Sequence, residues 1–330
     1  METARVVRFK RIGGPEVLSI EDIEKPEPGP GEVRLEVCAF ALNRADCLFI
    51  RGQHYSQASL PSRIGSEASG IVDAIGEGVS EFEPGDKVCT IPFHNDKYGV
   101  QGEFAVYPAQ YVAPWPERLS AVQACSVWMQ YLTAYFALLE VGKAGTGDFV
   151  LIPAASSSAG LGAIQLVTDV GATAIATTRT DEKKQFILQA GAGHVVVTER
   201  EDLARRIDEI TDGAGVRLVY DPIGGSFLKS YVDALARHAT IFLYGLLSGE
   251  PTVVEIVPMV RKAAVLHPYS MFNHVSEPVE LARGKNYIQE RLGDGRLTPL
   301  VDRVFDFEQV VEAYQYMESN QQKGKIVVRV

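Results

Sequence analysis

Strand-like and helix-like segments alternate regularly between residues 149 and 245, and this alternation constrains the fold more than any other feature of the sequence. Short apolar, β-rich runs predict strands at Phe149–Pro153, Thr173–Thr178, His194–Thr198, Arg217–Asp221 and Thr240–Gly245. Segments with helical periodicity lie between them, at Ser158–Val170, Asp181–Ala190, Asp202–Thr211 and Phe227–Ala236. Strands that are joined by helices run parallel in one sheet, so the alternation predicts a doubly wound α/β unit.

The first of these predicted helices has a distinct apolar face and a distinct end. Ala159, Ala163, Leu166, Val167 and Val170 share one side at helical spacing. Gly171 follows, where a helix commonly ends in a left-handed residue. Together with the predicted strands, this helix favours a Rossmann-like sheet, the fold in which dinucleotides bind at the carboxyl ends of the strands.

The segments on either side of this unit predict a second domain. Residues 5–112 contain short predicted strands that are separated by Pro/Gly turns. Four further elements are expected outside the α/β unit: helices at Ala121–Leu139, Glu277–Leu292 and Phe307–Ser319, and a final strand Gly324–Val330. That strand needs a sheet to join, and the simplest closure returns it to the amino-terminal strands. We therefore expect a mainly-β domain of residues 1–121 plus 267–330, with a dinucleotide-binding domain of residues 122–266 inserted into it.

Composition argues against several classes of partner and site. The 330 residues carry a net charge of −10 without long like-charge runs, which argues against nucleic acid or an anionic membrane as the partner. No apolar stretch approaches the roughly 20 residues of a membrane span, and residues 1–10 lack the apolar core of a signal peptide. We therefore expect a cytoplasmic protein that acts on a small molecule. The four cysteines have no C-x-x-C spacing, so they predict neither disulfides nor a structural metal site.

The turn after the first strand of the α/β unit is built mainly from small residues. Residues 153–162 read Pro-Ala-Ala-Ser-Ser-Ser-Ala-Gly-Leu-Gly. A pyrophosphate that docks on the N–H groups of a helix N-terminus needs close approach of the backbone, which such residues permit. The predicted contacts are Ser157, Ser158, Ala159 and Gly160. An ordinary strand-to-helix turn is the alternative, and the repeated strand–helix units that follow make it the weaker one.

The end of the second predicted strand indicates which nicotinamide cofactor is preferred. NAD-specific sites usually have an acid there, which accepts a hydrogen bond from the ribose 2′-hydroxyl. This chain instead has Thr178 and Arg179, followed one turn later by Lys183, and a guanidinium suits a 2′-phosphate. These residues favour NADPH over NADH, although the nearby acids Asp181 and Glu182 oppose that preference.

Further motifs, distributed along essentially the whole chain, indicate a family. They are Gly13-Gly14-Pro15-Glu16-Val17-Leu18, Pro28-Gly29-Pro30-Gly31-Glu32-Val33, Asn43-Arg44-Ala45-Asp46, Gly65-Ser66-Glu67-Ala68-Ser69-Gly70, Val79 to Asp86-Lys87-Val88, Thr133-Ala134-Tyr135 and Lys323-Gly324-Lys325. With these motifs the sequence resembles the medium-chain dehydrogenase/reductase superfamily, specifically its zinc-free quinone oxidoreductase branch. The resemblance implies a groES-like catalytic domain that holds the inserted Rossmann domain, with the active site in the cleft between them.

The resemblance also bears on a catalytic metal. Zinc-bearing relatives have Cys near the position of Asn43 and His at the position of Ser66, and many have a Cys-rich lobe for a second metal. Asn and Ser are poor zinc ligands compared with Cys and His, so no metal site is predicted. Without a Lewis acid to bind an alkoxide, alcohol oxidation is the less favoured chemistry.

The resemblance implies reduction of a quinone, an α,β-unsaturated carbonyl or an enoyl thioester. Asn43 and Tyr55 match positions that can donate to the acceptor's carbonyl oxygen, and Asp46 is expected to hold the Asn43 loop. Capping of a turn by Asn43 and a surface position for Tyr55 are the structural alternatives. Six further residues match positions that contact the cofactor: Thr133, Gly245, Leu246, Phe272, Asn320 and Lys325.

Three other functions stay open at this point. A biosynthetic cyclase or isomerase that retains the cofactor, a non-catalytic NADPH-binding protein and an alcohol dehydrogenase could each use the same fold. A homodimer is also expected, because a sixth strand near Pro251–Val257 is predicted at the edge of the Rossmann sheet, where its Val and Ile content suits pairing with a second copy.

Overall fold

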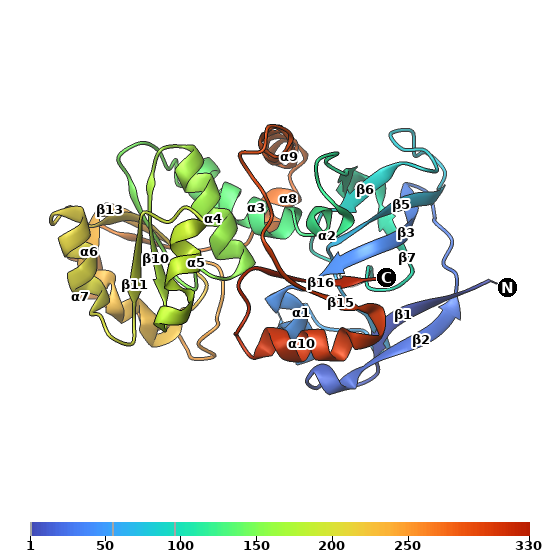
Figure 1. The fold of residues 1–330 in the computed structure, drawn as a ribbon, viewed down its shortest axis with the longest axis horizontal. Coiled ribbons are helices and arrows are strands. Elements are labelled where there is room, and N and C mark those ends of the chain that lie inside the picture. Colours follow the sequence, from blue (N-terminus) through green and yellow to red (C-terminus); the bar gives the residue numbers. More distant parts are fainter. Residues whose placement is uncertain (1, 55, 96) are drawn as a thin grey trace. The chain divides into compact units, whose positions relative to one another are not determined.

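The computed structural model describes residues 2–54, 56–95 and 97–330, which form two compact units (Figure 1). Unit 1 comprises Met1–Met129 and Gln289–Val330, and unit 2 comprises Gln130–Ile288. The two units divide the chain after Met129 and after Ile288, whereas the sequence predicts domain boundaries after residues 121 and 266. The predicted boundaries stay a proposal.

Six parallel strands form the sheet of unit 2, in the order β11-β10-β9-β12-β13-β14. Their bounds are β9 (Phe149–Ile152), β10 (Thr173–Thr178), β11 (His194–Val197), β12 (Val216–Asp221), β13 (Leu235–Leu243) and β14 (Val265–Pro268). The predicted doubly wound parallel sheet is therefore confirmed. Because the strands are parallel, their carboxyl ends meet at one edge of the sheet.

Helices α4 (Ser158–Asp169), α5 (Lys184–Gln189) and α6 (Leu203–Thr211) pack on this sheet, with α4 against β9 and β10 and α5 against β11 (Figure 1). Three residues of the predicted apolar face of α4 are buried: Ala163, Leu166 and Val167. Gly171 has a φ of +78°, so it adopts the left-handed conformation expected just after this helix. The first predicted helix is thus confirmed in its position and its orientation.

Two predictions in unit 2 are wrong. The segment predicted as helix Phe227–Ala236 forms the 3₁₀ segments Gly225–Ser230 and Val232–Ala234, after two glycines with positive φ that turn the chain sharply. The predicted strand Pro251–Val257 is a loop that leads into helix α7 (Ile256–Lys262), and the sixth strand is β14 instead. Pro258 is tolerated in the first turn of α7, where its missing N–H has no partner to lose.

The remaining helical segments come before and after the sheet of unit 2 along the chain. The predicted helix Ala121–Leu139 is divided into α2 (Ala121–Ala124), α3 (Trp128–Ala134) and a π-helical segment Tyr135–Val141. After the sheet come α8 (Phe272–Val275) and α9 (Pro278–Gly293), which ends in unit 1.

Unit 1 is built around strand β3 (Glu32–Ala41), which pairs with β5, β7 and β16. The other strands of its seven-stranded sheet are β5 (Ala68–Ile75), β6 (Lys87–Thr90), β7 (Phe104–Pro108), β8 (Val112–Pro114), β15 (Val301–Asp306) and β16 (Lys325–Arg329). A smaller sheet contains β1 (Thr3–Phe9), β2 (Leu18–Glu24) and β4 (Ser62–Arg63). Since β16 runs antiparallel to β3, the predicted return of the final strand to the amino-terminal sheet is confirmed.

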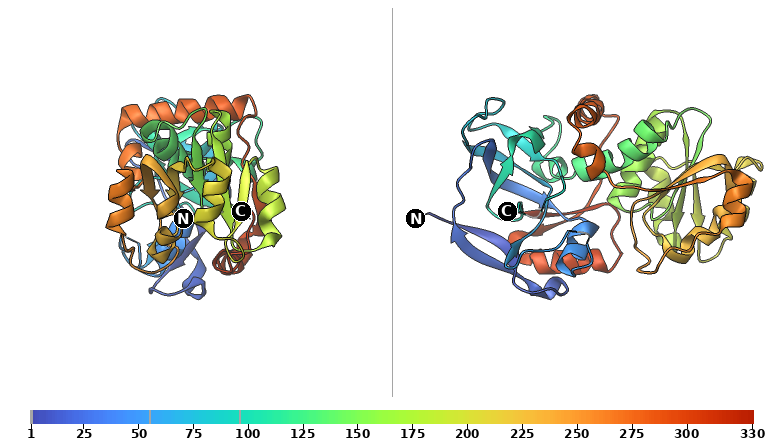
Figure 2. Two further views of the ribbon diagram at one scale, coloured as in Figure 1. Left: turned by 90° about the vertical axis from the view of Figure 1, so that its left-hand side faces the viewer. Right: turned by 180° about the vertical axis from the view of Figure 1, so that it is seen from behind.

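Helix α10 (Val310–Glu318) contacts strands β15 and β16 and the short helix α1 (Arg44–Ile50) (Figure 2). It buries Val310, Ala313, Tyr314 and Met317 in the core of unit 1. These contacts hold the carboxyl-terminal and amino-terminal parts of unit 1 together, and they place β16 beside the start of α1. Among the helices that the structure describes, none has the length and apolar character needed to cross a membrane.

Candidate functional site

The turn after β9 has the features expected of a pyrophosphate site. Ser157 is the N-cap of α4, and its Oγ accepts a hydrogen bond of 3.1 Å from the Gly160 N–H. A Cβ at position 160 would lie 2.7 Å from the Ala155 Cα, so only glycine fits there. Ser158 and Ala159 form the first turn of the helix, where backbone N–H groups have no partner inside the helix. The turn therefore offers N–H donors and a close backbone, both of which suit a phosphate.

The end of β10 carries the residues predicted to bind a 2′-phosphate. Thr178 is nearly buried and its hydroxyl donates to the Thr180 carbonyl, whereas Arg179 is exposed. Lys183 lies half-buried at the end of the 3₁₀ segment Asp181–Lys183. All three residues thus lie at or just after the carboxyl end of β10, the strand next to β9, at the edge where the turn after β9 lies.

A residue that the sequence analysis did not single out also lies at this edge. The Arg200 guanidinium forms an ion pair of 2.6 Å with the Asp181 carboxylate, and both side chains are more than half exposed. Asp181 is one of the two acids that the sequence analysis counts against a 2′-phosphate, and here its carboxylate is paired with a cation. Only its position just after the third strand of the unit could have drawn attention to Arg200.

Gly245 and Leu246 follow strand β13 at the same edge. A Cβ at position 245 would lie 2.6 Å from the Pro222 carbonyl oxygen, which explains the glycine, and Leu246 is largely exposed. Elsewhere in unit 2, the Thr133 hydroxyl lies 3.1 Å from the Met271 sulfur, and the Thr133 carbonyl accepts from the Tyr269 hydroxyl. Phe272 begins α8, next to Met271. The observed contacts of Thr133 are with Met271 and Tyr269, and the prediction that Thr133 and Phe272 both line a cofactor site stays a prediction.

In unit 1, Asn43 lies just before α1, where its N–H donates to the Asp46 Oδ2 at 2.8 Å. Asp46 is buried, and this contact supports the prediction that it holds the Asn43 loop. Burial is the main cause that raises the pKa of the Asp46 carboxyl to about 7. The second predicted catalytic residue, Tyr55, lies outside the described residues.

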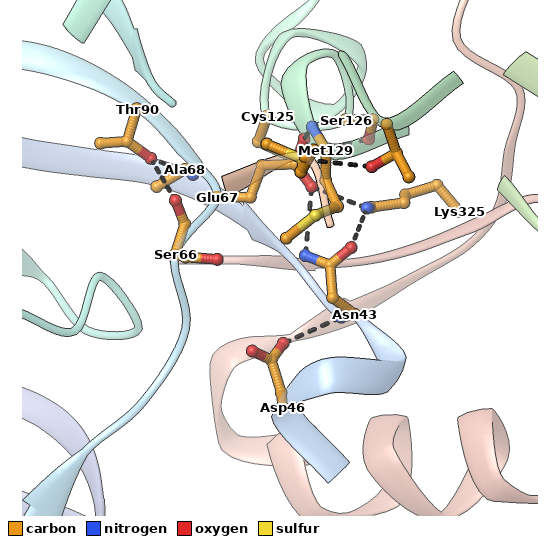
Figure 3. Close-up of polar contacts among 12 residues, drawn as sticks. Asn43, Asp46, Ser66, Glu67, Ala68, Thr90, Cys125, Ser126, Met129 and Lys325 are labelled. Carbon is orange, nitrogen blue, oxygen red and sulfur yellow. Dashed lines mark hydrogen bonds and ion pairs between the residues drawn. The ribbon is translucent and has the colours of Figure 1, made fainter. Parts of the chain in front are cut away.

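The side chain of Asn43 belongs to a buried polar cluster with Glu67 and Lys325 (Figure 3). The Lys325 ammonium donates to the Asn43 Oδ1 at 2.7 Å and to the Glu67 Oε2 at 2.6 Å. The Asn43 Nδ2 donates to the same Glu67 oxygen at 3.2 Å, and the Met129 N–H donates to the other one at 2.8 Å. Lys325 and Glu67 are each only 1% exposed. The observed contacts of Lys325 are inside unit 1, and its contact with a cofactor stays a prediction.

Asn320 follows α10 on the surface of unit 1, in a left-handed conformation with a φ of 58°. Its Oδ1 accepts a hydrogen bond of 2.7 Å from Arg44, the residue after Asn43. Asn320 is therefore tied to the start of α1, as Lys325 is, although its predicted contact with the cofactor is untested.

The donor set around Asn43 does not fit a catalytic zinc ion. The side chains at positions 43 and 66 are an amide and a hydroxyl, and the nearby Glu67 carboxylate is paired with an ammonium group. The Lys325 ammonium lies 2.6 Å from the Glu67 carboxylate, and its positive charge repels a divalent cation. Within residues 2–54, 56–95 and 97–330, no group of three or more His, Cys, Asp or Glu side chains is arranged to hold a metal ion.

The raised pKa of Asp46 predicts a pH dependence of stability. The carboxyl of an Asp in an unfolded chain has a pKa of about 3.9, so the folded protein binds the Asp46 proton more tightly than the unfolded chain does. The stabilisation is fully present below about pH 4 and is lost as the pH rises through about 7. Asp46→Asn keeps an oxygen for the Asn43 N–H, so the free energy of unfolding should fall less between about pH 5 and about pH 8 than in the wild type. Urea denaturation measures the free energy of unfolding at each pH, and an equal fall for the two proteins would contradict the prediction.

Comparisons with known proteins bear on the family and the fold of this chain. Residues 29–117 match the model of the alcohol dehydrogenase GroES-like domain, and residues 159–281 match that of the zinc-binding dehydrogenases. A 2-haloacrylate reductase from Burkholderia sp is 30% identical over 99% of both chains. The structure of Escherichia coli quinone oxidoreductase in complex with NADPH superposes with a TM-score of 0.91 at 28% identity and covers 99% of this chain and 100% of that chain. An NAD-dependent alcohol dehydrogenase has the same TM-score at 29% identity, over 99% of both chains.

Proposed function

This chain belongs to the medium-chain dehydrogenase/reductase superfamily, in its quinone oxidoreductase-like branch, and from that premise we propose that it is an NADPH-dependent reductase that acts without zinc on a quinone or an α,β-unsaturated carbonyl. The observation that carries the proposal is the cluster of Asn43, Glu67 and Lys325. It presents a hydrogen-bond donor in a setting that does not suit a metal ion.

Such a reduction requires only a few hydrogen-bond donors from the protein. The nicotinamide supplies a hydride when it is bound, and the acceptor's oxygen becomes negatively charged as the hydride adds. A donor that is already oriented toward this oxygen stabilises the charge, and removal of one such donor typically costs about 100-fold or more in rate. The Asn43 Nδ2 group is the donor that we assign to this oxygen, and we propose the Tyr55 hydroxyl as a second.

For the cofactor, we propose that Ser157, Ser158, Ala159 and Gly160 hold the pyrophosphate. Thr178, Arg179 and Lys183 are proposed to bind the 2′-phosphate, which makes NADPH the preferred cofactor. The pairing of Asp181 with Arg200 supports this preference, because it neutralises an acid that would repel the phosphate. We also propose that Thr133, Gly245, Leu246 and Phe272 lie near the nicotinamide, and that Asn320 and Lys325 complete the contacts to the cofactor.

The test is a spectrophotometric assay of nicotinamide oxidation with a panel of quinones, enones and enoyl thioesters, with a metal chelator present throughout. NADPH and NADH are compared in parallel. Turnover that resists the chelator and prefers NADPH supports the proposal. Tight binding of NADPH without turnover on any acceptor would point instead to a redox-neutral cyclase or to a binding protein. Turnover that requires zinc would point to an alcohol dehydrogenase.

We propose in addition that two copies of the chain associate through the edge of the unit 2 sheet. Among the residues that the structure describes, β14 is the last strand of that sheet, and an edge strand can pair with another strand. Five apolar side chains on and near α7 and β14 are each more than half exposed: Val253, Ile256, Val257, Val260 and Val265. An apolar surface of this kind commonly marks a protein interface.

The dimer is predicted to dissociate when a charge is placed on this surface. Val260→Asp should give a monomer mass in light scattering at a concentration where the wild type has twice that mass. The far-ultraviolet circular dichroism should stay unchanged, because the Val260 side chain is exposed. A wild-type protein that is monomeric at every concentration would rule out this interface.

A further inference from the structure

We propose that Lys325 and Glu67 are positioning residues for Asn43. They hold its carboxamide in a single orientation, in which the NH₂ group is the side available to the carbonyl oxygen of the substrate. This inference rests on the proposed reduction and specifies how the same site acts on its substrate.

The chemistry of the two partners determines the orientation of the amide. A lysine ammonium can only donate hydrogen bonds, so the Asn43 atom that lies 2.7 Å from it must be the oxygen. An ionised carboxylate can only accept, so the atom that faces Glu67 at 3.2 Å must be the nitrogen. The orientation of an amide is usually a matter of interpretation, but here both neighbours require the same one.

Burial makes this orientation strongly preferred. Lys325 and Glu67 are each 1% exposed and Asn43 is 7% exposed, so water does not screen the charges. A rotation of the amide by half a turn would place its NH₂ group against the ammonium and its oxygen against the carboxylate. Both hydrogen bonds would be lost and replaced by repulsive contacts in a medium where electrostatic interactions are strong.

The carboxylate that orients the amide is itself fixed in place. Glu67 comes directly before strand β5, and its second oxygen accepts a hydrogen bond of 2.8 Å from the Met129 N–H in α3 (Figure 3). Lys325 is the first residue of β16, which pairs with β3 just before Asn43. The three side chains therefore come from separate elements that the sheet and the start of α3 hold together.

One hydrogen of the amide remains available for a ligand. The Asn43 Nδ2 carries two hydrogens, and Glu67 accepts one of them. The other has no protein acceptor among the residues that the structure describes. When hydride adds to the β-carbon of the acceptor, the π-electron pair moves toward the carbonyl oxygen, and this second N–H donates to the negative charge that develops there. A proton from water then completes the reduction, and the hydride would come from bound NADPH, which would leave as NADP⁺.

The kinetic test is a double-mutant cycle between the pair and Asn43. Glu67→Gln combined with Lys325→Met removes both charges with little change of volume and leaves no cation to anchor the Asn43 oxygen. We expect kcat at saturating NADPH to fall about 30-fold, less than the ~100-fold or more that removal of such a donor typically costs, because the amide stays in place but is no longer held in one orientation. In an Asn43→Ala background the same two substitutions should have no further effect on kcat. A purely structural role predicts the same loss in both backgrounds, and that result would overturn the proposal, as would a folded variant with wild-type kcat.

A second measurement does not depend on activity, and its result is observed in the wild-type protein. In an NMR spectrum of the ¹⁵N-labelled wild-type protein, the Asn43 side-chain amide should give two well-separated proton signals, which are assigned by their loss in Asn43→Asp. Addition of NADP⁺ with a saturated ketone should shift mainly one of them. Equal shifts of the two signals would overturn the inference, because rotation about the amide C–N bond is slow and only one of the two N–H groups should meet the ketone. If the amide is fixed but no acceptor is reduced, the positioning stands and the proposed function fails.

Discussion

Glu67→Gln alone should lower the free energy of unfolding by about 3–5 kcal/mol, since it leaves the Lys325 ammonium buried without a counter-charge. Glu67→Gln together with Lys325→Met should cost much less, because neither residue then carries a charge in the interior. Buried ion pairs behave in this way because each ion has given up its hydration, which only the partner compensates. Urea denaturation of the single and double variants measures both values.

A surface ion pair provides the matched control. Glu209 is paired with Arg205 on the exposed side of α6, so Glu209→Gln removes the same charge in water. We expect that change to have little effect on the free energy of unfolding, because water screens an exposed ion pair. If Glu67→Gln were no more costly than Glu209→Gln, water would have to reach the Lys325 ammonium in the folded protein, and the argument from burial would fail.

The elements that the sequence predicts well are those with a strong local pattern. Leu151, Ile175 and Val196 lie in short strands rich in apolar and β-branched residues, and all three side chains are completely buried in the sheet of unit 2. The segment Pro251–Val257 has the same β-branched composition, yet Val253 and Val257 are exposed in a loop and a helix. Composition could not separate these cases, because strand formation depends on a neighbouring strand that provides hydrogen bonds, and a single sequence does not reveal that neighbour.

The residues of the candidate site also differ in how well the sequence predicts them. The turn Ser157–Gly160 could be predicted because a strand, small residues and a helix follow one another within a few positions. The pair of Glu67 and Lys325 could not, although both residues belong to recognised motifs, because 258 positions separate them. A contact over such a distance depends on strand β16 returning to β3. The sequence suggested that return but not which side chains it would bring together.

Arg179→Glu should lower kcat/KM for NADPH by about 100-fold and leave kcat/KM for NADH within about threefold. The substitution removes a charge-assisted contact worth about 1.5–3 kcal/mol and replaces it with an acid that repels the 2′-phosphate. NADH has a hydroxyl at that position, so an acid costs it little. Steady-state assays with both cofactors measure the ratio. Arg237→Glu is the control, since it makes the same change of charge near the amino end of β13, away from the edge that holds Arg179.

Variants of the Arg200–Asp181 ion pair test how Arg200 contributes to the preference for NADPH. If Arg200 acts by neutralising Asp181, Arg200→Gln should lower kcat/KM for NADPH about tenfold by exposing the carboxylate, and the addition of Asp181→Asn should restore it. If the double variant stayed as poor as Arg200→Gln alone, Arg200 would contact the phosphate itself. If Arg179→Glu and its control reduced activity equally with both cofactors, the end of β10 would not be the site that distinguishes NADPH from NADH.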